Sequence, residues 1–186
     1  MYTLLANFNP MKRVDWLLRA FAAIAPKRRL RLLLLGDGVE RARLERQSEE
    51  LGIGKSTQFL GRHSDVRPIL WAADVGALCS RSEGCSNALL EQMASGVPVV
   101  ASAVGGTPEL LSDGRGLMFA ADSIDGLVSA LQTLVADLRL RETLARRALE
   151  FVRESRAHQR TVARYESEFR AIAARSTAGR GRDVCR

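Results

Sequence analysis

The chain contains few residues that could bind a metal or form a disulfide. It has three cysteines (Cys79, Cys85 and Cys185) with no C-x-x-C pair, and two histidines (His63 and His158) without metal-ligand spacing. A disulfide framework or a zinc site is therefore not expected, and no metal is assigned. With no histidine partner evident for either, we interpret Cys79 and Cys85 as small packing residues.

Long apolar runs are also missing. The longest uncharged stretch, residues 92–108, is interrupted by glycine, serine and proline, so it does not predict a membrane span. The apolar stretch at the N-terminus is too short for a signal peptide. A reducing, cytoplasmic location fits these features best.

Lysine is scarce, because only three of the 28 basic residues are lysines. The bias toward arginine carries no weight as a nucleic-acid signal. The net charge is +7, of which residues 175–186 carry +3. The composition, 46% hydrophobic and 26% charged, is typical of a soluble globular protein. We expect one domain over residues 1–174, followed by a disordered basic tail at 175–186, for which an electrostatic arm is the alternative.

Short apolar runs alternate with helical patterns along the chain. Continuous apolar strands are typical of strands buried on both faces, so we predict an α/β fold: a doubly wound, Rossmann-like parallel sheet with extra C-terminal helices. The expected strands are 2–6, 30–35, 57–60, 75–79, 97–101 and 116–119, and the expected helices are 10–25, 40–51, 66–72, 87–95, 107–111, 124–137, 140–152 and 158–174.

Ligands of such sheets bind beyond the carboxyl ends of the strands. This rule selects five loops, which hold six of the 15 glycines: 7–12, 36–38, 61–65, 80–87 and 101–106.

Two carboxylates, Glu83 and Glu91, are eight residues apart in and beyond one of these loops. Glu142 and Glu150 have the same spacing in an ordinary helix, so the spacing alone also fits solvated rim residues. However, Glu91 lies among apolar residues, where a pair of ribose hydroxyls would satisfy it. The helix that begins near Asn87 directs free N–H groups into the same loop and is suited to phosphate oxygens.

Small residues in these loops would let a ligand approach the backbone. Gly84 and Ser86 do so in one loop, and Gly105 and Gly106 in the next. The segment 36–38 lacks the third glycine of a dinucleotide fingerprint, so hydride transfer is not favoured.

Three basic residues follow strand ends. Lys12 could neutralise a leaving phosphate, or be an ordinary surface lysine. Arg62 and His63 could line a nucleotide base, or be plain loop residues. In the last predicted helix, an apolar stripe and a basic side fit either peripheral membrane contact or a core-facing helix with a solvated face.

Several motifs occur in the order and spacing of a known family: NPMKRVDWLLRAFA, LRLLLLGDGVERARLE, FLGRHSDV, AADVGALCSRSEGCSNALLEQMASGVPVVAS and VGGTPELLSDGRGLMF. From about Tyr2 to Ala174 the chain resembles the C-terminal, donor-binding half of family 4 retaining glycosyltransferases, which have two facing Rossmann-like domains. The resemblance implies transfer of a hexosyl group from a nucleotide-sugar to a hydroxyl acceptor with retention. The nucleotide-sugar is then the donor substrate, and neither a cofactor nor a metal is implied.

The resemblance also implies roles for single residues. Glu83 would contact the donor sugar, and Lys12 would stabilise the departing diphosphate. The backbone amides near Asn87 and Ala88 would hold the diphosphate, and Glu91 would hold the ribose.

Other positions of the implied donor site are less regular. Arg62 would contact the base. Asn7 stands where the family most often has an arginine, so one of two cationic diphosphate ligands is missing. Cys85 and Ser86 depart from the commoner Phe-Gly, in a pocket that includes Gly84.

The family's N-terminal, acceptor-binding domain is expected to be absent from this chain. A chain without it is expected to bind donor but not to transfer sugar. Two alternatives stay open: a non-catalytic nucleotide-sugar-binding module or subunit of a split enzyme, and a basic protein that associates with membranes or nucleic acid.

Overall fold

The computed structural model describes residues 2–5, 7–25, 30–155 and 165–170. The chain divides into two units, Met1–Glu150 and Phe151–Arg186. The tail predicted at 175–186, and most of the helix predicted at 158–174, lie outside the described residues. Peripheral membrane contact through that helix therefore stays a prediction. No helix in the described ranges is long and apolar enough to cross a membrane.

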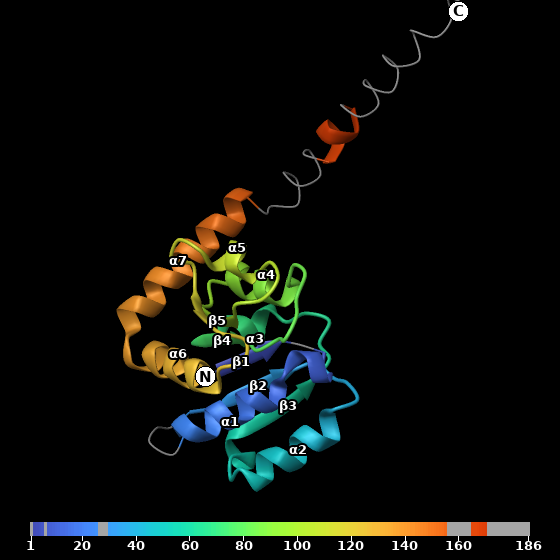
Figure 1. The fold of residues 1–186 in the computed structure, drawn as a ribbon, viewed down its shortest axis with the longest axis vertical. Helices are drawn as coiled ribbons and strands as arrows, with labels where there is room; N and C mark the ends of the chain where they lie inside the picture. The colour runs from blue at the N-terminus through green and yellow to red at the C-terminus, as the bar shows by residue number, and fades with distance from the viewer. Residues whose placement is uncertain (1, 6, 26–29, 156–164, 171–186) are drawn as a thin grey trace, which may run out of the picture. The chain divides into compact units, whose positions relative to one another are not determined.

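The first unit is built on a single six-stranded parallel sheet (Figure 1). Leucine and valine side chains of β2, β4 and β5 are buried throughout, as expected for strands covered on both faces. The strand order is β3-β2-β1-β4-β5-β6, which confirms the predicted doubly wound, Rossmann-like sheet. The strands are β1 (Tyr2–Leu5), β2 (Leu32–Leu35), β3 (Thr57–Gly61), β4 (Val75–Leu78), β5 (Val99–Ser102) and β6 (Leu117–Phe119).

Helices cover both faces of this sheet. Right-handed crossovers place α1 and α2 on one side, where α6 joins them, and α4 and α5 on the other (Figure 1). The helices are α1 (Val14–Ile24), α2 (Arg41–Glu50), α3 (Arg67–Trp71), α4 (Asn87–Ala94), α5 (Thr107–Leu111), α6 (Ile124–Ala136) and α7 (Leu138–Ser155), with short 3-10 turns η1 (Pro10–Lys12) and η3 (Gly54–Ser56).

One predicted helix is divided. The sequence pattern indicated a continuous helix over residues 10–25, but Arg13 adopts a left-handed conformation with φ 46°. The segment Pro10–Lys12 is therefore a separate 3-10 turn, and α1 begins only at Val14. The turn keeps Lys12 at the carboxyl edge of the sheet instead of incorporating it into α1.

The apolar stripe of α1 forms the centre of the core. Its predicted core residues are all buried and pack with residues of α6 and the sheet. Burying one such leucine or phenylalanine side chain contributes about 1.5–3 kcal/mol. Those residues are Val14, Leu17, Leu18, Phe21 and Ile24.

The strand order reverses between β1 and β4. Chain connections from β1 lead outward to β2 and β3, and those from β4 lead the opposite way to β5 and β6. At such a switch point the loops that follow the two central strands diverge and leave a crevice, where ligands of doubly wound sheets bind.

The packing of α4 on the sheet depends on Gly76 in β4. A β-carbon at Gly76 would overlap the Oε1 atom of Gln92, whose side chain is fully buried. That oxygen is a buried acceptor without a hydrogen-bond partner among the described residues, while the amide nitrogen donates to the Ala88 carbonyl at 3.0 Å.

We therefore expect Gly76→Ala to lower the free energy of unfolding by about 1–3 kcal/mol, because the extra methyl group overpacks a filled core. Urea unfolding measures this loss. Gln92→Ala in the same chain removes both the clash and the unsatisfied oxygen, so the double variant should recover most of the stability. Additive losses would show that the two residues do not compete for space.

Candidate functional site

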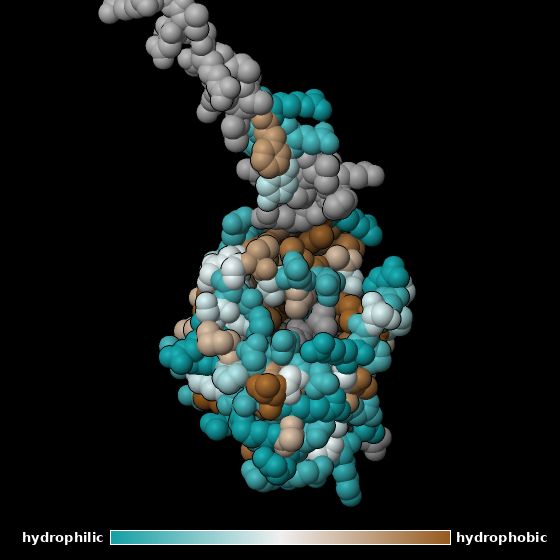
Figure 2. All heavy atoms as spheres, turned by 90° about the vertical axis from the view of Figure 1, so that its right-hand side faces the viewer, coloured by the Kyte–Doolittle hydropathy of each residue, from teal (hydrophilic) through white to brown (hydrophobic). Residues whose placement is uncertain are grey.

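The loops after β1 and β4 meet at the switch point. The backbone N–H of Arg81 donates to the Met11 carbonyl at 2.8 Å, which ties the two loops together. The strand arrows in Figure 1 point to its right-hand side, and Figure 2 looks onto that face, much of which is covered by hydrophilic residues.

An ion pair joins these loops at the side-chain level. The Nζ atom of Lys12 lies 2.5 Å from Oε1 of Glu83. Ser80, which is fully buried at the end of β4, donates its hydroxyl to the same oxygen at 2.5 Å. Because both bonds use Oε1, the second carboxylate oxygen of Glu83 has no hydrogen bond from the described residues and can accept one from a ligand. The Lys12 ammonium likewise retains two donor hydrogens.

A further hydroxyl bonds to Ser80, the residue that donates to Glu83. Ser102, at the end of β5, donates to the Ser80 carbonyl at 2.6 Å. The Ser102 hydroxyl, the Ser80 carbonyl and hydroxyl, the Glu83 carboxylate and the Lys12 ammonium therefore form a hydrogen-bonded series from β5 through β4 to the loop after β1. Such a connected polar network holds Glu83 in one orientation.

Local sequence explains why Lys12 reaches Glu83. The side chain of Asn9 accepts from the Met11 N–H at 3.0 Å and caps the 3-10 turn, in which Pro10 occupies the first position. Arg13 then stops the turn in the left-handed region, at a cost of about 1–3 kcal/mol for a residue with a β-carbon.

Asn7 lies at the opposite end of the same loop. It is exposed, and a β-carbon on Gly38 would meet its side-chain oxygen. The next residue, Phe8, is fully buried and its N–H donates to the Asp37 carbonyl at 3.0 Å. The loop after β1 therefore also rests on the loop after β2.

Helix α4 begins at this crevice. Ser86 is its N-cap, and the buried Ser86 hydroxyl accepts from the Leu89 N–H at 3.3 Å. Asn87 and Ala88 occupy the first helical positions, so their N–H groups have no acceptor within the helix. The free N–H groups and the helix dipole make this end of α4 favourable for an anion.

The glycines after β5 support the Glu83 loop. The N–H of Gly106 donates to the Gly84 carbonyl at 2.9 Å. Gly105 has φ 50°, and a β-carbon there would overlap the backbone carbonyl of Glu83. Glycine is therefore required at Gly105 for loop-on-loop packing, whereas Gly84 has open space around its α-carbon.

Glu91 lies just over one helical turn beyond the start of α4. Its side chain is exposed overall, but partial burial of the carboxyl group raises the pKa of Glu91 above its usual range. No hydrogen bond to this carboxylate occurs among the described residues. Hydroxyl donors from a ligand would stabilise the ionised form.

Arg62 and His63 follow β3 and are both exposed. The His63 ring nitrogen Nε2 lies 3.1 Å from the Leu60 carbonyl, so His63 bonds to its own loop. The structure brings Lys12 and Glu83 into direct contact, and within the described ranges it shows no contact of Arg62 or Glu91 with that pair.

The two cysteines near the site differ. Cys79 is buried, and burial raises the pKa of its thiol well above the usual range, which agrees with a packing residue. The same interpretation is wrong for Cys85, which the loop after β4 leaves exposed to solvent. No cluster of three potential metal ligands occurs in the described part of the chain.

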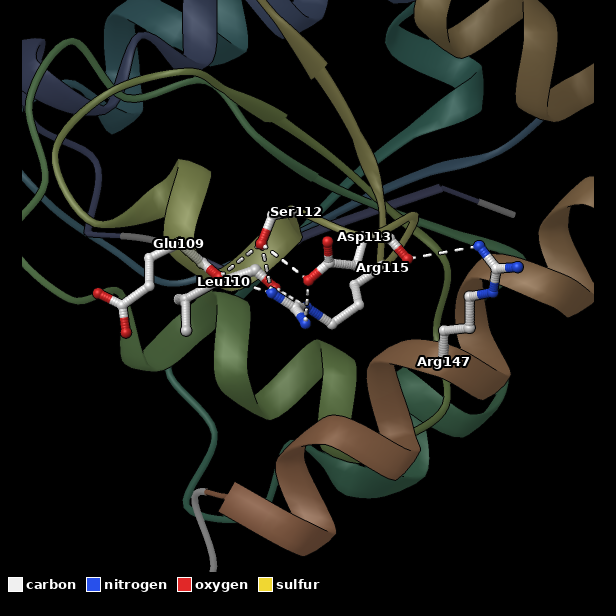
Figure 3. Close-up of polar contacts among 6 residues, drawn as sticks. All are labelled: Glu109, Leu110, Ser112, Asp113, Arg115 and Arg147. Atoms are coloured by element: carbon white, nitrogen blue, oxygen red, sulfur yellow. Dashed lines mark hydrogen bonds and ion pairs between the residues drawn. The ribbon is translucent and has the colours of Figure 1, made fainter.

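An arginine cluster at the far end of α5 was not anticipated from the sequence (Figure 3). Arg115 donates to the carbonyls of Leu110 and Glu109, each at 2.8 Å, and so caps the C-terminal end of the helix that follows Gly105 and Gly106. The remaining members of the cluster are Ser112, Asp113 and Arg147.

The fold and the site define a Rossmann-like domain with a candidate anion site at its switch point. A family model of glycosyl transferases group 1 matches residues 2–137, and the chain belongs to this family. The part of the family that it spans is of the C-terminal type.

Individual relatives agree with this assignment. N-acetyl-alpha-D-glucosaminyl L-malate synthase of Bacillus anthracis is 33% identical over 166 residues, which cover 89% of this chain and 44% of that protein. Sucrose-phosphate synthase of Thermosynechococcus elongatus superposes with a TM-score of 0.86 at 27% identity over 93% of this chain and 45% of that one.

A third relative was solved with a nucleotide. Anabaena Alr3699/HepE in complex with UDP has a TM-score of 0.80 at 25% identity, over 93% of this chain and 48% of that one. The chain thus spans less than half the length of each of these three relatives.

The raised pKa of Glu91 predicts a pH-dependent stability. The folded state binds the proton of the Glu91 carboxyl group more tightly than the unfolded state does. Protonation of Glu91 therefore stabilises the fold fully below the usual carboxyl pKa, and this stabilisation is lost as the pH rises through the raised pKa. Glu91→Gln cannot ionise. In the absence of nucleotide, urea unfolding over roughly pH 4 to pH 8 should show the variant gaining stability relative to the wild type as the pH rises. Parallel pH profiles would contradict this account.

Proposed function

We propose that this chain is the donor half of a nucleotide-sugar-dependent glycosyltransferase that moves a hexosyl group to a hydroxyl acceptor with retention. The observation that carries the proposal is the contact between Lys12 and Glu83 across the switch point, beside the start of α4. Family membership supports it, and the UDP bound by the Anabaena neighbour supports a nucleotide donor. Retention rests on the resemblance to family 4.

The donor diphosphate would lie between Lys12 and the first turn of α4. The N–H groups of Asn87 and Ala88 would donate to phosphate oxygens, and the Lys12 ammonium would neutralise the charge that develops as the sugar departs. In this arrangement the lysine and the helix N-terminus together stabilise the leaving group.

Glu83 would hold the sugar. Its Oε1 atom is occupied by Lys12 and Ser80, so its Oε2 atom would accept a sugar hydroxyl. Because one carboxylate contacts both the lysine and the sugar, movement of Lys12 toward the phosphate and docking of the sugar would be coupled.

The nucleoside would occupy the outer part of the site. Glu91 would accept hydrogen bonds from the ribose hydroxyls, and these bonds would compensate for the partial loss of solvation of its carboxylate. Arg62 would contact the base. Asn7, Gly84, Ser86, Gly105 and Gly106 would complete the donor pocket. Ser86 caps α4, Gly84 leaves open space for a ligand, and Gly105 and Gly106 let the loop after β5 pack closely against the backbone of Glu83 and Gly84.

The second candidate is a nucleotide-sugar-binding module or subunit that does not itself transfer sugar. The coverage of the relatives favours it, since the chain spans less than half of their length. Both candidates bind donor, and only an acceptor-dependent assay separates them.

Lys12→Ala should weaken the binding of a nucleoside diphosphate by about ten- to hundredfold, the loss of one charge-assisted hydrogen bond. Binding of the corresponding nucleoside should not change. Isothermal titration calorimetry with UDP, GDP and ADP, and with their nucleosides, measures both. Lys55→Ala is the matched control, because Lys55 is exposed and precedes β3, at the opposite edge of the sheet. An equal loss of affinity for the nucleoside and for the nucleoside diphosphate would show that Lys12 has a structural role.

Glu91→Ala should weaken both the nucleoside and the diphosphate, because the ribose is common to them. The expected loss is about 1–3 kcal/mol of binding free energy, from two hydrogen bonds. Glu150→Ala, which removes an exposed carboxylate paired with Arg146 in α7, should leave the affinity unchanged. Calorimetry that shows wild-type affinity for Glu91→Ala would refute the ribose assignment.

The 186-residue chain alone should bind donor without transferring sugar at a useful rate. Transfer needs the acceptor hydroxyl to be held against the anomeric carbon, and such positioning contributes about 7–11 kcal/mol to lowering the barrier. An assay of sugar transfer, with and without a separately expressed N-terminal domain of a relative, tests this. Robust acceptor-dependent transfer by the chain alone would contradict the half-site proposal.

A further inference from the structure

The residue after Lys12 is held in place by contacts unrelated to the crevice. Arg13 sits between the 3-10 turn η1 and helix α1, and its guanidinium bonds to the loop after β6. Nη1 donates to the Ala121 carbonyl at 2.5 Å, and Nη2 donates to Oδ1 of Asp122 at 2.9 Å. The guanidinium carbon also lies 4.5 Å from the ring centre of Trp16.

These contacts bury the arginine in spite of its charge. The Arg13 side chain is only 13% exposed, whereas the side chain of Asp122 is 84% exposed. A guanidinium that is this well covered keeps its geometry, because its donors are fixed by a carbonyl, a carboxylate and an aromatic face. Its two hydrogen-bond partners, Ala121 and Asp122, lie more than one hundred residues further along the chain.

The backbone conformation of Arg13 is unusual for a residue with a side chain. Its φ of 46° lies in the region that favours glycine, yet an arginine occupies it. Glycine would make the same turn without strain, so the shape of the turn does not require this side chain. The contacts to Ala121 and Asp122 are what the arginine adds.

We infer that Arg13 is a positioning residue for Lys12: it fastens the η1 turn to the loop between β6 and α6 and so fixes the direction in which the Lys12 ammonium enters the crevice. This inference rests on the proposed function of Lys12 as the diphosphate ligand. Arg13 itself does not contact the donor, because its guanidinium is committed to the loop after β6.

Arg13→Gly removes the side-chain contacts and keeps a backbone that adopts φ 46° without strain. It should weaken the binding of the preferred diphosphate among UDP, GDP and ADP by about tenfold in calorimetry, and leave nucleoside binding unchanged. Asp122→Asn removes the charge of one partner and should give a smaller loss of the same kind. Arg19→Ala, an exposed arginine of the same helix α1, is the matched control and should change neither affinity.

A double-mutant cycle separates positioning from a general loss of structure. If Arg13 acts through Lys12, Arg13→Gly should have no further effect on diphosphate binding in a Lys12→Ala background. Additive losses, or an equal loss for the nucleoside, would overturn the inference.

Hydrogen–deuterium exchange tests the same inference without nucleotide. The Lys12 N–H donates to the Asn9 carbonyl in the η1 turn, and the Arg81 N–H donates to the Met11 carbonyl of that turn. In Arg13→Gly they should exchange about tenfold faster or more, while the amides of β1 and β2 keep their protection. Unchanged exchange at Lys12 and Arg81 would overturn the inference. If the wild-type chain bound none of the nucleotides, the proposed function would fail, and the exchange comparison would still decide whether Arg13 fixes the turn.

Discussion

The ion pair between Lys12 and Glu83 is the interaction on which the site depends. The two residues are 71 positions apart in sequence and meet because β1 and β4 are neighbours where the strand order reverses. Each partner is fixed from its own side: Lys12 by the capped 3-10 turn, and Glu83 by the hydroxyl of Ser80. A surface ion pair contributes little by itself, but one that is held by a polar network defines a geometry for ligands.

The loops around this pair support one another. The loop after β4 is bonded to the loop after β1 through Arg81, and to the loop after β5 through Gly84 and Gly106. Because Gly105 closely approaches the backbone of Glu83, the loop after β5 supports the backbone that carries the Glu83 carboxylate. Beyond it, Arg115 fixes the other end of α5 (Figure 3). The position of the Glu83 loop thus depends on residues outside the ion pair.

Much of this could be predicted from the sequence, and the exceptions have physical causes. Continuous apolar strands between helical patterns indicated the parallel sheet, and the position of Glu83 after a strand end indicated its place in the crevice. The helical pattern around Pro10 did not reveal the break at Arg13, because a left-handed residue other than glycine leaves no composition signal. The pairing of Ser80 with Glu83 was missed because a serine at a strand end is common. The exposure of Cys85 was missed because loop orientation is set by tertiary contacts.

A crystal structure of the chain with a nucleoside diphosphate, chosen from UDP, GDP and ADP by thermal shift, tests directly whether Lys12 and α4 bind the diphosphate. The terminal phosphate should lie within hydrogen-bond distance of Lys12 Nζ and of the first N–H groups of α4, and the ribose hydroxyls should contact Glu91. A nucleotide bound away from the carboxyl ends of β1 and β4, or a phosphate out of reach of Lys12, would contradict the account.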